Sequence, residues 1–232
     1  MATVDFIPTE RKEDEGHWIS VADMMSGLMM VFLFIAIVYI NNIGRYFDAV
    51  SDAQSKICND LQREFANNID EWSLQICEDG LVVRFQNESI FPPNDSEPSL
   101  EFQQILASFY PRFMEIIWNN NEDISELRIE GHTSSEGLPQ QDLFQAYLHN
   151  TELSQDRSRN VMNFVLSLSD IASNNEYMTW SFNNTTAHGL SSSELILDGN
   201  AEDREGSRRV EFRLATTAQE NLAGLVEQLN AN

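Results

Sequence analysis

A long apolar run near the N-terminus constrains this chain of 232 residues more than any other feature. Residues 21–40 read VADMMSGLMMVFLFIAIVYI, and such a run in a helix spans about 30 Å, the thickness of the hydrocarbon core of a bilayer. Trp18 and Tyr39 place amphipathic rings near the two membrane interfaces. The sequence therefore predicts a transmembrane helix over residues 18–40. A cleaved signal peptide is the alternative, but it has a shorter apolar core and a basic start.

One carboxylate lies inside this run. Asp23 follows Trp18 by five residues, about 7 Å along a helix axis. A charge at that depth is costly, so such residues face protein or water and mark functional sites. Ala22 and Ser26 form a small-xxx-small pair that lets two helices approach closely. We expect a dimer with Asp23 and Ser26 near its seam and reversible protonation of Asp23; the alternative is that Asp23 caps the helix or reaches the interface.

The composition excludes several classes of protein. The chain has 14 Lys and Arg against 37 Asp and Glu, a net charge of −23, which repels nucleic acid and anionic surfaces. Its two cysteines, Cys58 and Cys77, exclude a disulfide-dense scaffold and a four-cysteine zinc site. No nucleophile elbow, metal triad or HExxH motif is present in the sequence. We therefore predict neither an enzyme nor a metal protein, and no direct contact with nucleic acid.

Helix and strand patterns alternate after the apolar run. Charged residues with apolar positions three, four and seven apart continue the helix through residues 41–70. Residues 71–232 then predict one α/β domain, with helices on a mixed sheet. We expect a hairpin that turns at Asp79-Gly80. Helices are expected over residues 100–118 and 221–229, and a third helix is expected to begin after an N-cap at Ser154. Strands are expected over residues 124–130, 177–182 and 208–214. Residues 1–17 precede the membrane helix as a tail.

Four motifs resemble known families. Trp18, Ala22-Asp23, Met25, Ser26-Gly27 and Met29-Met30 resemble the membrane helix of the MotB family of ion-driven stator proteins. Three further motifs resemble OmpA-like peptidoglycan-binding domains: LRIEGHTSSEG at 127–137, NTELSQDRSRNV at 150–161 and SRRVEFRL at 207–214. Within the MotB-like proteins, the chain looks most similar to subunits of an anti-phage defence system, because its N-terminus is acidic and little chain separates the membrane helix from the domain.

The resemblance implies a place and a mechanism. The N-terminus would be cytoplasmic, the helix would cross the bacterial inner membrane and the domain would lie in the periplasm. Two copies would form the core of a ring of MotA-like polytopic subunits, and ion flow would protonate and release Asp23, drive rotation and signal to cytosolic defence effectors. A lone carboxylate with few nearby hydroxyls favours protons over sodium, and no cofactor is expected. A passive OmpA-type wall tether and a flagellar-type stator are the alternatives.

The resemblance also implies a site for peptidoglycan. Its expected residues are Arg157, Asn150, Leu153, His149 and Ser134. In the family, an arginine at the position of Arg157 takes the carboxylate of diaminopimelate, and an aspartate takes its amine. Ser134 replaces that aspartate here, and Glu136 is the candidate substitute. The alternative is that Arg157 only pairs with Asp156 or Glu152 on its own helix.

His132 is interpreted as a loop hydrogen-bonder rather than a metal ligand, since no second histidine stands at metal spacing. In an oxidising periplasm the two cysteines can reach one surface, and we predict a Cys58–Cys77 disulfide.

Overall fold

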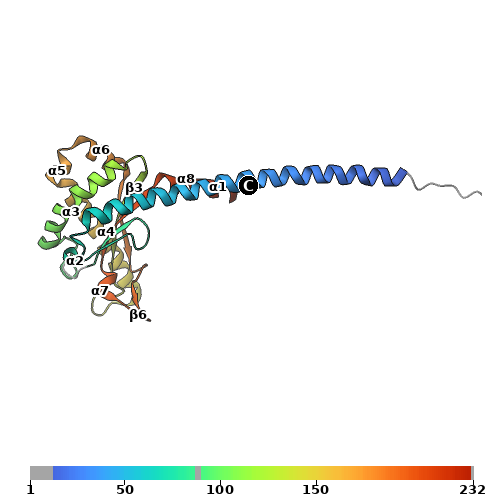
Figure 1. Ribbon diagram of the computed structural model, residues 1–232. Helices are drawn as coiled ribbons and strands as arrows, with labels where there is room; N and C mark the ends of the chain where they lie inside the picture. The colour runs from blue at the N-terminus through green and yellow to red at the C-terminus, as the bar shows by residue number, and fades with distance from the viewer. Residues whose placement is uncertain (1–12, 87–89, 231–232) are drawn as a thin grey trace, which may run out of the picture. The chain divides into compact units, whose positions relative to one another are not determined.

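The structure, a computed structural model, describes residues 13–86 and 90–230. The chain divides into two compact units that meet between Asp48 and Ala49. The first unit holds the apolar stretch of a long helix, α1. The second holds the last turns of that helix and the other described helices and strands (Figure 1).

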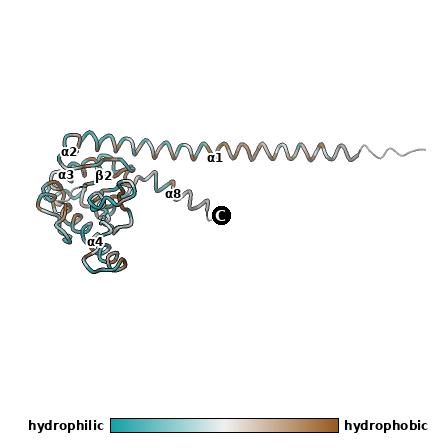
Figure 2. The backbone as a smooth tube through the Cα atoms, turned by 90° about the horizontal axis from the view of Figure 1, so that it is seen from below, coloured by the Kyte–Doolittle hydropathy of each residue, from teal (hydrophilic) through white to brown (hydrophobic). Residues whose placement is uncertain are grey.

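Helix α1 runs from Glu13 to Phe65 and changes character along its length. From Trp18 to Ile40 every side chain is exposed, and Figure 2 shows this stretch as strongly hydrophobic. By length and composition, α1 is apolar enough to cross a membrane. In the second unit, Ile57, Leu61 and Phe65 are fully buried, because residues four apart share one helix face. The same helix therefore contains a candidate membrane-spanning segment and, further along, residues that belong to the core of the second unit.

The second unit is built on a five-stranded mixed sheet with the order β1-β2-β7-β3-β4. Its strands are β1 (Leu74–Ile76), β2 (Val82–Phe85), β3 (Ile124–His132), β4 (Thr185–Ser191) and β7 (Val210–Thr216). β3 and β4 are parallel, and the other neighbours are antiparallel. A separate two-stranded hairpin consists of β5 (Leu197–Asp198) and β6 (Ala201–Glu202). The predicted fold class, one N-terminal apolar helix and a mixed α/β domain, is confirmed.

Helices pack on this sheet around a core of aromatic rings. They are α2 (Ile69–Trp72), α3 (Leu100–Asn119), α4 (Leu143–Ser167), α5 (Ser169–Ala172), α6 (Asn175–Asn184), α7 (Arg204–Ser207) and α8 (Thr217–Asn230). The ring centroid of Phe109 lies 4.9 Å from that of Phe65 on α1 and 5.3 Å from that of Phe212 on β7. α1, α3 and the sheet thus share one core.

The predicted hairpin and disulfide are both present. β1 and β2 pair around Gly80, whose φ of 85° is the left-handed conformation that favours glycine. Cys77 follows β1 and is bonded to Cys58 on α1, with their Cα atoms 6.1 Å apart. The bridge fastens the last turns of α1 to the hairpin turn.

The start of α4 corrects one prediction. The helix begins at Leu143, not after Ser154, and Asp142 is its N-cap. The Asp142 carboxylate accepts a hydrogen bond from the backbone N–H of Gln145, and the Gln145 side chain accepts one from the backbone N–H of Asp142. The apolar side chains of these first turns, such as that of Leu143, are exposed and do not pack into the core. Ser154 lies inside the helix, where its hydroxyl accepts from the backbone of Ser191 on β4.

The strand predicted over residues 177–182 is also wrong. These residues belong to α6, which begins after Asn174, whose side chain accepts from the backbone N–H groups of Glu176 and Tyr177. Alternating large and small side chains resemble a strand, but this N-cap favours a helix. The strand in this region is β4, which follows α6 directly and pairs with β3 in parallel. The predicted helices over 100–118 and 221–229 correspond to α3 and α8, and the strands over 124–130 and 208–214 to β3 and β7.

Candidate functional site

A cavity of about 470 Å³ opens at the carboxyl end of β3, and we call it the β3–α4 cavity. The loop after β3, one face of α4, residues 90–94 and Arg208 line it. Four of the five expected peptidoglycan-binding residues are among the lining side chains: Ser134, Asn150, Leu153 and Arg157. The fifth, His149, is half-buried on α4 and is not a lining residue. Segments far apart in the sequence thus meet at one hollow.

Arg157 is the main cationic group of the cavity. The residue is only 5% exposed; its Nε donates to the backbone oxygen of Asp95 at 2.9 Å, and its guanidinium lies 4.6 Å from the ring centre of Phe91. Burial, with the positive charge of Arg208, lowers the pKa of Arg157 to about 10, so the group remains charged at neutral pH. Its helix neighbour Asp156 pairs with Arg159 instead. These contacts aim a fixed guanidinium at the cavity rather than at its own helix.

Asn150 holds the loop that forms the opposite wall. Its side-chain amide donates to the backbone oxygens of Ser134 at 3.1 Å and Glu136 at 2.9 Å. The helix can approach because Gly131 lies under it: a Cβ there would meet the Ser154 backbone oxygen at 2.5 Å. The glycine of the predicted strand-loop motif and the asparagine of the helix motif therefore act together, setting the distance between α4 and the loop.

The charge balance of the cavity favours an anion. Glu136 lines it but is engaged by Arg204 at 2.5 Å and Arg208 at 3.7 Å. Ser134, one of the expected peptidoglycan-binding residues, brings no charge. Glu136 is thus shared between two guanidinium groups, while Arg157 and Arg208 both face the cavity. In an otherwise acidic chain, this concentration of positive charge suits a carboxylate ligand.

Thr133 adds a neutral hydrogen-bonding group. It lines the cavity and is 3% exposed, and its hydroxyl has no hydrogen-bond partner in the part of the chain that the structure describes. A buried hydroxyl without a partner is costly. A polar ligand in the cavity would supply the missing partner.

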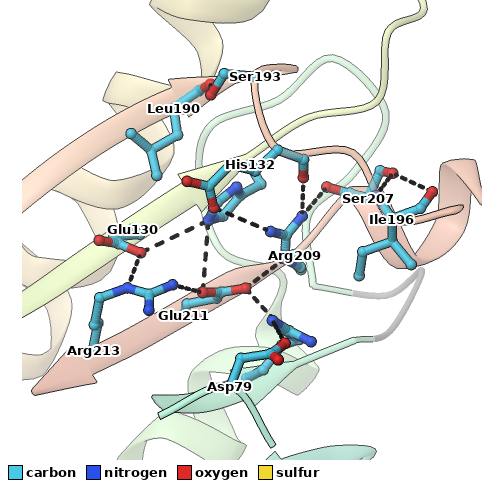
Figure 3. Close-up of polar contacts among 12 residues, drawn as sticks. Asp79, Glu130, His132, Leu190, Ser193, Ile196, Ser207, Arg209, Glu211 and Arg213 are labelled. Atoms are coloured by element: carbon cyan, nitrogen blue, oxygen red, sulfur yellow. Dashed lines mark hydrogen bonds and ion pairs between the residues drawn. The ribbon is translucent and has the colours of Figure 1, made fainter. Parts of the chain in front are cut away.

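A buried ionic cluster lies beside the cavity and includes residues of β2, β3 and β7 (Figure 3). Glu211 on β7 accepts from Arg209 at 2.6 Å, Arg84 at 2.7 Å and Arg213 at 2.8 Å. Burial alone would raise the pKa of Glu211, but the hydrogen bond and charge of Arg209 outweigh it and lower the pKa to about 2. Arg213 also donates to Glu130 on β3 at 2.8 Å. The cluster ties β2, β7 and β3 together below the cavity loop.

His132 lies inside this cluster in its neutral form. It is 1% exposed, and burial, reinforced by the charge of Arg209, lowers its pKa to about 3. Ligand atoms of His132, Glu130 and Glu211 lie within 4.8 Å of one another, the spacing of a metal site. The carboxylates, however, already accept from three arginines, and a cation would add to their positive charge. The residues therefore do not fit a metal ion.

The sequence contained a signal for this cluster that the motif comparison did not use. From Arg209, just before β7, to Arg213, charged residues alternate with Val210 and Phe212, so the charged side chains share one face of the extended chain. Such alternation usually indicates a solvated face, and these residues are instead largely buried. Which acid pairs with which arginine depends on the register between β3 and β7, which no local pattern encodes.

The expected ion-translocation residues lie in the first unit. Asp23 and Ser26 are three residues apart on α1, so they share a face of the helix. Ser26 donates to the backbone oxygen of Ala22 at 2.8 Å. Asp23 is exposed, and its carboxylate makes no hydrogen bond or ion pair with any other residue that the structure describes.

Comparison with known proteins bears directly on the family. No protein-family model matches the chain. The chain is similar to the Zorya protein ZorB of an Escherichia coli strain, with 36% identity over 230 residues that cover 94% of this chain and 96% of that protein. It is also similar to the Zorya protein ZorB of a second Escherichia coli strain, with 27% identity over 225 residues that cover 88% of this chain and 83% of that protein.

A solved structure supports the fold. The chain is similar to a MotB-like protein from Desulfovibrio vulgaris, with 21% identity and a TM-score of 0.51, over 73% of this chain and 94% of that chain. At this identity the likeness concerns the fold alone. The resemblance that the sequence motifs predicted is confirmed.

Proposed function

The chain belongs to the ZorB family, and from this premise we propose that it is the wall-anchored, stator-like subunit of an anti-phage membrane complex. In this proposal α1 crosses the inner membrane with the N-terminus in the cytoplasm. The α/β unit lies in the periplasm and binds peptidoglycan. Neither part has a catalytic role.

The observation that carries the wall-binding proposal is the buried, charged Arg157 in the β3–α4 cavity. Its Nε and its ring contact are satisfied within the chain, which leaves its terminal nitrogens to form a fork with a ligand carboxylate. The carboxylate of diaminopimelate in a stem peptide is the proposed partner, and Thr133 is the proposed second contact. Glu136 is the proposed neighbour of the amine, because it is the acidic residue among those that line the cavity, and Arg204 and Arg208 would have to share its charge with the ligand.

Asp23 carries the second part of the proposal, ion coupling. A helix that served only as an anchor would gain nothing from a carboxylate in its apolar stretch, and would bear its cost. We assign Asp23 the reversible binding of an ion, with a proton favoured over sodium, and Ser26 a place on the same helix face. A unit charge moved through 100 mV gains about 2.3 kcal/mol, enough to bias a helix contact.

The proposed assembly follows from the exposed surface of α1. Its apolar side chains from Trp18 to Ile40 need lipid or other helices around them, and Ala22 with Ser26 allows close helix approach. We place two copies of this chain inside a ring of MotA-like polytopic subunits. Rotation of that ring around the anchored pair would signal to cytosolic defence effectors.

The wall-binding proposal is tested by sedimentation of the full-length protein, in detergent, with purified sacculi. We expect Arg157→Ala to weaken binding about ten- to a hundredfold, because a charged hydrogen bond contributes about 1.5–3 kcal/mol. Ser134→Ala should have a smaller effect, since Ser134 brings no charge. The matched control is Arg159→Ala, two residues along α4, where the arginine is exposed and paired with Asp156.

Two results would refute this assignment. If the wild-type protein fails to sediment with sacculi, the wall-binding proposal falls. If Ser134→Ala costs more than Arg157→Ala, the ligand does not use the guanidinium as proposed. A phage-protection assay on the same Arg157→Ala variant tests whether protection depends on wall binding. Because the anchor must resist torque, the variant should lose protection together with binding.

A further inference from the structure

An unpartnered apolar face lies at the start of α4, on residues that the proposed function does not use. Leu143, Phe144, Tyr147 and Leu148 are between 50% and 89% exposed, and their spacing places them on one side of the helix. We call these four residues the apolar face of α4. They lie within a stretch, residues 143–151, that contains no charged side chain.

The start of this face, at Leu143 and Phe144, lies near the β3–α4 cavity. A shallow depression of about 620 Å³ lies between the first turn of α4, including Leu143 and Phe144, and the loop after β3. Gly137 lines both this depression and the cavity. A Cβ at Gly137 would meet the Cβ of Ala146 at 2.4 Å, so the loop lies directly against α4 at this point. The two hollows are therefore adjacent parts of one surface.

The chemistry of the face selects its ligand. Two aromatic rings and two aliphatic side chains, without charge, suit the apolar faces of neutral rings better than an ionic partner. The side chains of Gln141 and Asp142 at the depression offer hydrogen-bonding groups at its edge. Sugar rings combine apolar faces with polar hydroxyl edges, and in peptidoglycan they are covalently joined to the stem peptide that we place in the cavity.

We propose that the apolar face of α4 is a platform for the glycan strand of peptidoglycan, with Phe144 and Tyr147 contacting sugar rings. This inference rests on the proposed function of the adjacent cavity and names a second part of the same polymer. A second copy of the chain is the competing occupant. A standard interface needs roughly 800 Å² per partner, more than these four side chains alone can supply, so the glycan is favoured.

The test measures binding of the full-length protein in detergent to three probes: a disaccharide–peptide fragment, the free stem peptide, and glycan strands without peptide. We expect the double variant Phe144→Ala with Tyr147→Ala to bind the disaccharide–peptide about tenfold more weakly, on the scale of one or two aromatic contacts. Binding of the glycan strands should be lost, while binding of the free peptide should not change. The unchanged peptide arm also shows that the variant is folded.

The matched control is Phe182→Ala, an aromatic residue on α6 that is 72% exposed, against 68% for Phe144; it should leave all three affinities unchanged. Equal binding of the disaccharide–peptide by the wild type and the double variant would overturn the proposal. So would a shift from dimer to monomer in sedimentation without loss of glycan binding, which would assign the face to a second copy. If the wild type binds no stem peptide, the proposed function of the cavity fails, whereas glycan binding that depends on Phe144 and Tyr147 would still support the platform.

Discussion

Asp23 and Arg157 are both charged side chains in surroundings where a charge is costly, and the chain treats them in opposite ways. Arg157 is buried and receives a backbone oxygen and an aromatic ring from its own chain. Asp23 lies in an apolar stretch and pairs with no other residue in the ranges 13–86 and 90–230. The residues that line the β3–α4 cavity all come from one chain, whereas under the proposed function the surroundings of Asp23 come from other subunits.

We expect substitution of Asp23 to have a larger effect on phage protection than the other changes proposed below. Asp23→Asn keeps the shape and hydrogen bonding of the side chain but removes its titration, so we expect complete loss of phage protection with normal expression and normal sacculus binding. The measurement is plating efficiency beside sedimentation of the same variant. Asp48→Asn, on the same helix beyond the apolar stretch, is the control and should protect as the wild type does. Full protection by Asp23→Asn would end the ion-coupling proposal.

The second prediction compares the two parts of α1 by making the same change, leucine to alanine, once in each part. Leu61 is fully buried in the second unit and Leu33 is exposed in the first. Leu61→Ala should lower the free energy of unfolding of the α/β unit by about 2–5 kcal/mol, the range for a leucine removed from a core. Leu33→Ala should leave it unchanged. Denaturant titration followed by tryptophan fluorescence makes the comparison, and equal effects would mean that the last turns of α1 are not part of the core.

The motifs brought the right segments to the cavity because the strand, loop and helix that form its wall are consecutive. Ser134, Asn150 and Leu153 lie within twenty residues of one another, and a glycine that lets α4 touch β3 is part of the same pattern. A mixed sheet covered by helices was likewise predictable from the alternation of helix and strand patterns. The Cys58–Cys77 bridge was predictable because the chain has only these two cysteines.

What the sequence could not show are contacts between distant segments. Asp95 and Phe91, which hold Arg157, precede it by more than sixty residues, and Arg204 reaches Glu136 from a similar distance. No periodicity links such pairs. The early start of α4 was hidden for another reason: its apolar residues face outward, where amphipathic patterns predict polar ones.

A smaller effect is expected in how the stability of the α/β unit depends on pH. The pKa of His132 is about 3 in the folded protein against 6.5 for an unperturbed histidine, so between these values the unfolded chain binds more protons. Stability should therefore fall as pH drops from about 6.5 toward 3, with a slope of at most about 1.4 kcal/mol per pH unit from this residue. Between pH 7 and 5, above the range in which Glu211 titrates, His132→Gln should lose less stability than the wild type.

The control for this prediction is His188→Gln, where the histidine is exposed on β4. Its unfolding free energy should follow the wild-type pH dependence. Identical pH profiles for the wild type and His132→Gln would show that His132 is not buried in neutral form.

We propose that ion coupling and wall binding take place at separate sites. Ion flux can be measured in vesicles that contain the full-length chain purified with its polytopic membrane partner. Sacculi are absent from such vesicles, so only the site at Asp23 should matter. We predict the same proton flux for the wild type and Arg157→Ala, and none above background for Asp23→Asn. Flux that survives Asp23→Asn, or that disappears with Arg157→Ala, would contradict the account.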